Sequence, residues 1–176
     1  MKKYTLALAV SAAILGSSAM AAAGPNHITF IGEVSDQTCQ VAINGNDTNP
    51  VVLLPTVATT DFASAGDVAG ETTFVMSVSG CDGTAVTAKT QFVGNAVDTN
   101  GYMKNIAADG AENVALQLLA EGAAIDLNNS LPVAGPSVIA GETEGSAEYA
   151  VQYVATDADV TAGAVTGTVQ FSITYL

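Results

Sequence analysis

The segment from Thr168 to Tyr175 alternates strictly between polar and apolar residues, and this constrains the fold more than any other feature of the sequence. Successive side chains of a strand point to opposite sides, so the apolar residues share one face. They are Val169, Phe171, Ile173 and Tyr175. A strand of this kind has to bury that face, and an unpaired edge beside it would favour aggregation unless a partner covers it. We therefore expect a sheet strand here that needs a partner.

Short apolar or alternating runs, separated by turn-forming residues, fill most of the chain after Cys39. We predict strands at four of these runs, Val51–Leu54, Thr72–Val78, Thr90–Val93 and Tyr149–Val154. The pairs expected to form turns are Asn44-Gly45, Asn100-Gly101, Asp109-Gly110 and Asn128-Asn129. This arrangement is typical of an all-β sandwich.

The stretch from Ala107 to Glu121 also suits a short helix, because it is rich in Ala, Leu and Glu. Within it, however, Val114, Leu116 and Leu118 alternate with other residues. Alternation with a period of two favours a strand over a helix. We therefore predict a strand here as well.

The first residues have the three parts of a secretion signal. Lys2 and Lys3 supply the positive start, and the apolar run from Leu6 to Leu15 is shorter than the roughly 20 residues that span a bilayer. Ala19-Met20-Ala21 then supplies the small residues of a cleavage site. We expect residues 1–21 to be removed between Ala21 and Ala22, with Ala23 as an alternative site, and no membrane anchor to remain.

Cys39 and Cys81 are the only cysteines, and in an exported chain we expect them to form a disulfide. The closed loop would reduce the entropy of the unfolded chain by an amount worth roughly 4 kcal/mol. A redox pair or a metal site would need other spacing, because there is no C-x-x-C motif and only one histidine, His27. The prediction is a structural disulfide and no metal.

The charge of the mature chain excludes several partners. After cleavage, only Lys89 and Lys104 remain against 17 acidic residues, and the sequence has no arginine. Binding to nucleic acid or to anionic lipid requires clustered cations. We therefore expect neither partner, and we interpret the acidic surface as a solubility feature outside the cell.

A second strand-like segment, Ile28 to Val34, lies near the start of the mature chain. Its apolar residues Ile28 and Phe30 fall on one side, and the whole segment precedes Cys39. A short arm of this pattern at a free N-terminus can complete the sheet of another molecule.

Several of these features together resemble one known family. They are the run Phe30 to Val34 followed by Cys39, the second cysteine in Ser79-Gly80-Cys81-Asp82, the strand Gln91 to Gly94, and the tail with penultimate Tyr175. In order and spacing they resemble the major pilin subunits of type 1 fimbriae, which assemble by the chaperone-usher pathway. The resemblance runs from about residue 27 to the end.

The resemblance implies an incomplete immunoglobulin-like β-sandwich, the pilin fold, which lacks its final strand. It divides the chain into a signal (1–21), a donor-strand extension (22–34) and a pilin domain (35–176). A periplasmic chaperone would fill the groove first, and at the outer-membrane usher the extension of the next subunit would replace it. The product is a homopolymer of neighbouring pilin subunits, a fimbrium on the cell surface.

The same resemblance assigns roles to residues. Ile28 and Phe30 would be donor side chains, and Val169, Phe171, Ile173 and Tyr175 would line the acceptor groove and contact the chaperone. Family donor strands carry a glycine four residues before the position of Phe30, where this chain has Asn26. Pro25 lacks a backbone donor, so it would lie at a non-bonding position or outside the donated strand.

No pattern in the sequence favours an enzyme or a cofactor. His27 lies in the expected donor arm, and Glu142 and Glu144 lie in a glycine-bounded loop without any tryptophan in the chain to form a sugar platform. Asp157 and Asp159 lack the remaining ligands of a calcium loop. We therefore predict a structural fimbrial subunit without catalytic residues. The alternative is a minor or tip-adaptor pilin, a β-sandwich binding module that contacts a host ligand.

Overall fold

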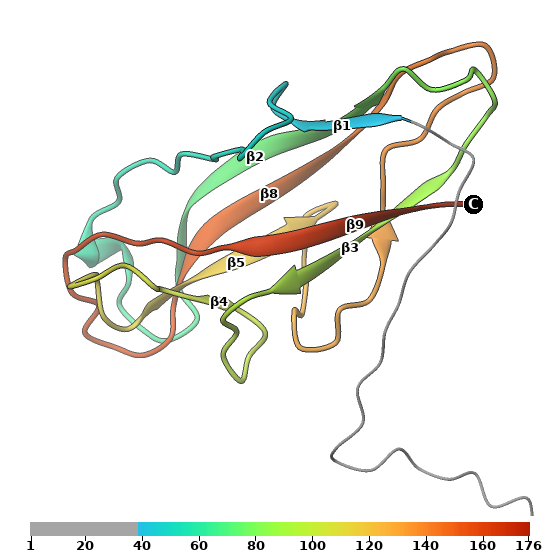
Figure 1. Ribbon diagram of the computed structural model, residues 1–176. Helices are drawn as coiled ribbons and strands as arrows, with labels where there is room; N and C mark the ends of the chain where they lie inside the picture. The colour runs from blue at the N-terminus through green and yellow to red at the C-terminus, as the bar shows by residue number, and fades with distance from the viewer. Residues whose placement is uncertain (1–38) are drawn as a thin grey trace, which may run out of the picture. The chain divides into compact units, whose positions relative to one another are not determined.

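The computed structural model describes residues 39–176, and its regular elements in this range are strands and one 3-10 turn, as Figure 1 shows. The strands are β1 (Gln40–Ile43), β2 (Val68–Ser79), β3 (Ala88–Gly94), β4 (Met103–Lys104), β5 (Val114–Ala120), β6 (Ala123–Ala124), β7 (Val133–Ala134), β8 (Gly145–Ala155) and β9 (Val169–Tyr175). The 3-10 turn is η1 (Thr59–Asp61). Among the described residues, no helix is long and apolar enough to cross a membrane.

The strands form two antiparallel sheets. The larger sheet has the order β1-β2-β8-β5-β4, with β6 paired to β5, and the smaller sheet has the order β7-β3-β9. In Figure 1 the smaller sheet, with β3 and β9, lies in front of β5 and β8 of the larger sheet. This arrangement confirms the prediction of an all-β sandwich.

The core lies between the two sheets, and it is built by alternation along each strand. Phe74 and Met76 of β2, Leu116 and Leu118 of β5, and Phe92 of β3 are all buried in one cluster. The stretch that also suited a helix is therefore a strand, since β5 places its even-numbered residues in the core.

Tyr149 of β8 joins the two sheets through its hydroxyl group. The hydroxyl donates a hydrogen bond to the Ala134 carbonyl of β7 (2.7 Å), and it shares a second with the Thr90 hydroxyl of β3 (2.8 Å). Its ring meets Phe92 edge to face, with 5.0 Å between ring centroids. Burial raises the pKa of Tyr149, while the hydrogen bond to Thr90 opposes the rise. The buried hydroxyls thus satisfy one another across the core.

The predicted turn at Asn44-Gly45 shows why these residue types are needed. Asn44 and Gly45 have φ of 49° and 78°, and Ile43 and Asn46 exchange two backbone hydrogen bonds of 2.9 Å across them. This is a two-residue turn with positive φ at both positions, which Asn-Gly favours. Positive φ also occurs at Gly101 and Asp109, in two of the other predicted turns.

The predicted strand at Val51–Leu54 is wrong. This segment forms no ladder with any described strand. Its side chains do alternate in burial, however, since Val52 and Leu54 pack on the core while Val51 and Leu53 are exposed. Pro50 and Pro55 bracket it, and proline cannot donate to a ladder. The other three predicted runs lie within β2, β3 and β8.

The predicted disulfide between Cys39 and Cys81 is present, and no described cysteine is free. Cys39 directly precedes β1 and Cys81 follows β2 closely, next to the Gln40 and Ser79 pair at the end of their ladder. The bond therefore fixes the start of β1 to the end of β2.

Replacing Tyr149 with Phe tests the link between the sheets. The variant leaves the buried Thr90 hydroxyl and the partly buried Ala134 carbonyl without the Tyr149 hydroxyl, so we expect it to lower the free energy of unfolding by about 1–3 kcal/mol. Tyr153→Phe is the matched control, because the Tyr153 hydroxyl bonds the Pro55 carbonyl at an exposed position. Denaturant unfolding of both variants measures the effect, and equal losses would contradict this account.

Candidate functional site

β9 is an edge strand of the smaller sheet. It pairs with β3 along its whole length, and no described strand pairs with its other edge. Each of its apolar residues lies opposite an inward residue of β3, for example Phe171 opposite Phe92 and Ile173 opposite Thr90. Because Thr90 and Phe92 are almost completely buried, the apolar face of β9 also points into the sandwich.

The register shows in which direction the backbone groups of β9 point. Leu176 donates to the Thr87 carbonyl (2.8 Å) and Asn95 donates to the Thr168 carbonyl (3.4 Å), so both pairs are hydrogen-bonded pairs of the ladder. Hydrogen-bonded and non-hydrogen-bonded pairs alternate in an antiparallel ladder. The N–H and C=O groups of Val169, Phe171 and Ile173 therefore point away from β3, toward the open edge. These residues combine inward side chains with outward-pointing backbone groups.

A groove of about 550 Å³ runs beside this open edge. Val169 and Phe171 form one wall, and the segment Pro50 to Leu54 forms the other. Core residues of both sheets make the floor, namely Phe74, Phe92, Leu116, Leu118 and Val151. Phe171 stays 39% exposed although it faces inward, because nothing in the described chain covers it from the groove. The site is a mainly apolar slot next to a strand edge.

The wall formed by residues 50–54 is held by side chains. Val52 and Leu54 pack on the core, and the Tyr153 hydroxyl donates to the Pro55 carbonyl (3.2 Å). Burial raises the pKa of Tyr153.

The edge strand β1 also has outward-pointing backbone groups. Those of Val41 point away from β2, since Asn44 and Val75 form a hydrogen-bonded pair of the β1-β2 ladder.

One end of the groove is formed by Val165 to Thr168, and Asn105 fixes this segment. The Asn105 amide nitrogen donates to the Ala111 carbonyl (2.8 Å) and the Ala164 carbonyl (2.9 Å). Its oxygen accepts from the backbone of Ala107 and of Thr166, both at 3.0 Å. Gly167 fits tightly here, because a Cβ would lie 3.0 Å from Leu116 Cδ1.

The four predicted acceptor residues are thus on one strand face but not all in the groove. Val169 and Phe171 line it, whereas Ile173 and Tyr175 pack on a smaller cluster formed by Val78, Cys81, Val86 and Val138. The predicted donor residues Asn26, Ile28 and Phe30, and the cleavage site at Ala21 and Ala22, lie outside the described residues.

The sequence did not predict that two segments line the groove, namely Pro50 to Leu54 and Val165 to Thr168. For the first, the sequence signal was a short apolar run bracketed by two prolines, which suits an unpaired wall better than a paired strand. The second has no apolar pattern, and it is placed by Asn105, which is distant in sequence.

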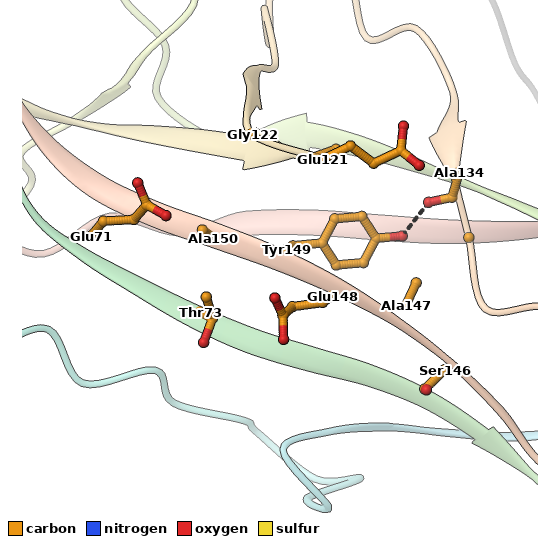
Figure 2. A pocket seen from close by; sticks show the side chains of 12 residues that line it. Glu71, Thr73, Glu121, Gly122, Ala134, Ser146, Ala147, Glu148, Tyr149 and Ala150 are labelled. Carbon is orange, nitrogen blue, oxygen red and sulfur yellow. Dashed lines mark hydrogen bonds between the residues drawn. The ribbon is translucent and has the colours of Figure 1, made fainter.

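A second hollow, shown in Figure 2, lies where β5 ends beside β8. Its volume is about 490 Å³, and Glu71, Glu121 and Glu148 are among its lining residues. Within residues 39–176, no three His, Cys, Asp or Glu side chains are grouped closely enough to hold a metal ion. Glu142, Glu144, Asp157 and Asp159 are exposed.

Comparison with known proteins gives one consistent result. The family model described as fimbrial protein matches residues 28–176. The F17 fimbrial protein of Escherichia coli is 38% identical to this chain over 99% of both sequences. The major fimbrial subunit SMF-1 of Stenotrophomonas maltophilia is 37% identical over 92% of this chain and 99% of its own length.

A solved structure gives the same result for the fold. The P pilus rod subunit PapA superposes with a TM-score of 0.57, over 78% of this chain and 99% of its own. At 16% identity, this match supports the fold alone.

Replacing Asn105 with Ala tests how the end of the groove is held. The variant removes all four hydrogen bonds of the amide, so we expect it to lower the free energy of unfolding by about 1–3 kcal/mol. Asn95→Ala is the control, since the Asn95 amide bonds only the exposed side chains of Thr168 and Gln170. Thermal unfolding compares the two, and an equally small loss in both would contradict the assignment.

Proposed function

The chain belongs to the fimbrial protein family, and from this premise we propose that it polymerises head to tail by donor-strand exchange. It is a structural subunit of a surface fimbrium, as its curated relatives are. The family is one of structural proteins rather than enzymes. In the proposed step, the N-terminal extension of one copy enters the groove of the next copy and pairs with β9.

The observation that carries this proposal is the open edge of β9 beside an apolar groove. An incoming strand would exchange main-chain hydrogen bonds with Val169, Phe171 and Ile173, whose backbone groups point to it. Main-chain bonds give affinity, while side chains at alternate positions of the strand enter the groove and set the register. The groove thus suits a strand of alternating pattern.

The N-terminal extension has that pattern. Ile28 and Phe30 are two residues apart, so they would point to the same side and enter the groove together, next to Phe171 and the floor of the core. Asn26, which stands where the family's glycine is usual, would be the residue that enters the tightest part of the groove. Burial of the two apolar side chains contributes about 1.5–3 kcal/mol each.

The position of the disulfide supports transmission of load along the fibre. The extension (22–34) would be followed closely by Cys39, which is bonded to Cys81 and directly precedes β1. A pull on a donated arm would therefore reach the larger sheet through both the disulfide and the β1-β2 ladder. The contact is heterologous and does not close, so it produces a filament rather than a ring.

Before assembly, the exposed groove has to be covered. We propose that a periplasmic chaperone lends a strand to the same edge, with Val169, Phe171, Ile173 and Tyr175 as its contacts, and that an outer-membrane usher exchanges it for the next subunit. The signal at residues 1–21 would direct the chain to the periplasm. A role as a minor or tip-adaptor pilin is not favoured, because the relatives that match over nearly the full length include a major fimbrial subunit.

Deleting residues 22–31 tests the role of the extension. The variant keeps the groove, so we expect it to form a stable complex with its chaperone and to end any fibre that it joins. Co-expression with the chaperone and usher, followed by electron microscopy, measures fibre length. Filaments of normal length would contradict the proposal.

Replacing Phe171 with Ala tests the groove itself. Its ring would be covered only when a strand is donated, so we expect a peptide of residues 24–36 to bind the extension-deleted subunit about tenfold more weakly. Ser172→Ala is the matched control on the opposite face of the same strand and should change binding less than twofold. Release of the chaperone by the peptide reports binding, and equal effects of both variants would refute the assignment of this wall.

A further inference from the structure

The chain contains two Asn-Gly pairs, Asn44-Gly45 and Asn100-Gly101, and both asparagines are exposed in turns. An asparagine followed by glycine is chemically labile, because the next backbone nitrogen can attack the carbon of the side-chain amide. A glycine at that position has no side chain to hinder the close approach. The same labile pair therefore occurs twice, and the two copies differ in how their side chains are held.

The Asn44 side chain is held by the larger sheet. Its oxygen accepts a hydrogen bond from the Val75 backbone nitrogen (2.8 Å), and the Asn44 backbone nitrogen donates to the Val75 carbonyl (2.8 Å). The side chain thus replaces a main-chain acceptor and extends the ladder of β1 and β2 by one position. To reach the Gly45 nitrogen, it has to leave this position, and the Val75 N–H group then loses its partner.

The Asn100 side chain, in contrast, makes no hydrogen bond within residues 39–176. Asp98 holds only the backbone of this turn, since its carboxylate accepts from the backbone nitrogens of Asn100 (2.8 Å) and Tyr102 (2.9 Å). The Gly101 nitrogen, the atom that would attack, donates to the Asp98 carbonyl over a long 3.3 Å. The Asn100 side chain can therefore turn toward Gly101 without breaking a hydrogen bond of its own.

We propose that Asn100 is a site of spontaneous deamidation in the folded subunit, whereas Asn44 is protected. The Gly101 nitrogen bonds to the side-chain carbon of Asn100, and the amide nitrogen leaves as ammonia with the proton that Gly101 loses. Water then opens the cyclic imide at either carbonyl, which leaves aspartate or isoaspartate at position 100. Water is the only other reactant. The groove lining includes neither turn, so this reaction does not depend on donor-strand exchange.

The difference between the two rates follows from the hydrogen bond at Asn44. Ring closure occurs in the fraction of molecules whose local structure has opened enough to allow it. One net hydrogen bond changes such a fraction by a factor of roughly two to ten. The Asp98 carboxylate also disfavours loss of the Gly101 proton, so we expect Asn100 to react more slowly in the folded subunit than in the unfolded chain.

The product would change the contact between this turn and residues 126–128. The Asp126 side chain lies against Gly101, and the Gly101 carbonyl accepts from the Leu127 nitrogen (3.2 Å). A new carboxylate at position 100 would lie close to Asp98, and like charges at short range repel. An isoaspartate would also lengthen the main chain by a carbon atom. Because Leu127 is buried in the core, deamidation would loosen the attachment of this turn to the core.

Peptide mapping of assembled fimbriae tests this inference. The fimbriae are incubated at mildly alkaline pH, and mass spectrometry measures at each asparagine the mass gained when NH2 is replaced by OH. We expect the Asn100 peptide to gain this mass about fivefold faster than the Asn44 peptide, and methylation specific for isoaspartate to label it. Asn49 is the internal control, because it is also exposed but precedes Pro50, whose nitrogen carries no hydrogen. It should gain no mass.

Two further samples separate the effect of the structure from that of the local sequence. In the reduced chain in denaturant the bond from Val75 is absent, so Asn44 and Asn100 should react at rates within about twofold of each other. Asn100→Gln should abolish the mass gain at position 100, since the larger ring forms more slowly, and should leave the rate at Asn44 unchanged. Equal rates at Asn44 and Asn100 in folded fimbriae would overturn the proposal, as would an Asn100 that gains mass no faster than Asn49.

Discussion

The open edge of β9 is the constraint on which the rest of the structure depends. The smaller sheet has three strands. Its last strand directs the side chains of Val169 and Phe171 into a groove, and the backbone groups of Val169, Phe171 and Ile173 toward an edge with which no described strand pairs. Core residues such as Phe92 and Leu118 consequently line an open groove. Buried apolar surface and paired backbone groups are the main requirements of a stable sandwich. In the proposed assembly, a strand from another molecule completes both, so folding and polymerisation would satisfy the same need.

Much of the fold, and part of the groove, could be predicted from local patterns in the sequence. The strict alternation at residues 168–175 gave the strand, its inward face and its need for a partner, and Asn44-Gly45 gave a turn with positive φ. The disulfide followed from the cysteine count in an exported chain. The prediction of a strand at Val51–Leu54 failed because a short apolar run indicates only a partly buried extended segment, whereas pairing depends on neighbours in space. Likewise, the division of β9 between the groove and the cluster around Cys81 depends on packing between distant segments.

Hydrogen exchange at the backbone of β9 tests the central claim most directly. In the unassembled subunit, the amides of Gln170, Ser172 and Thr174 bond to β3, while those of Val169, Phe171 and Ile173 point to the groove. The account predicts that assembly into fibres slows exchange at Val169, Phe171 and Ile173 to the rates of their neighbours. Exchange at these three amides that stays fast in assembled fibres would contradict donor-strand pairing at this edge.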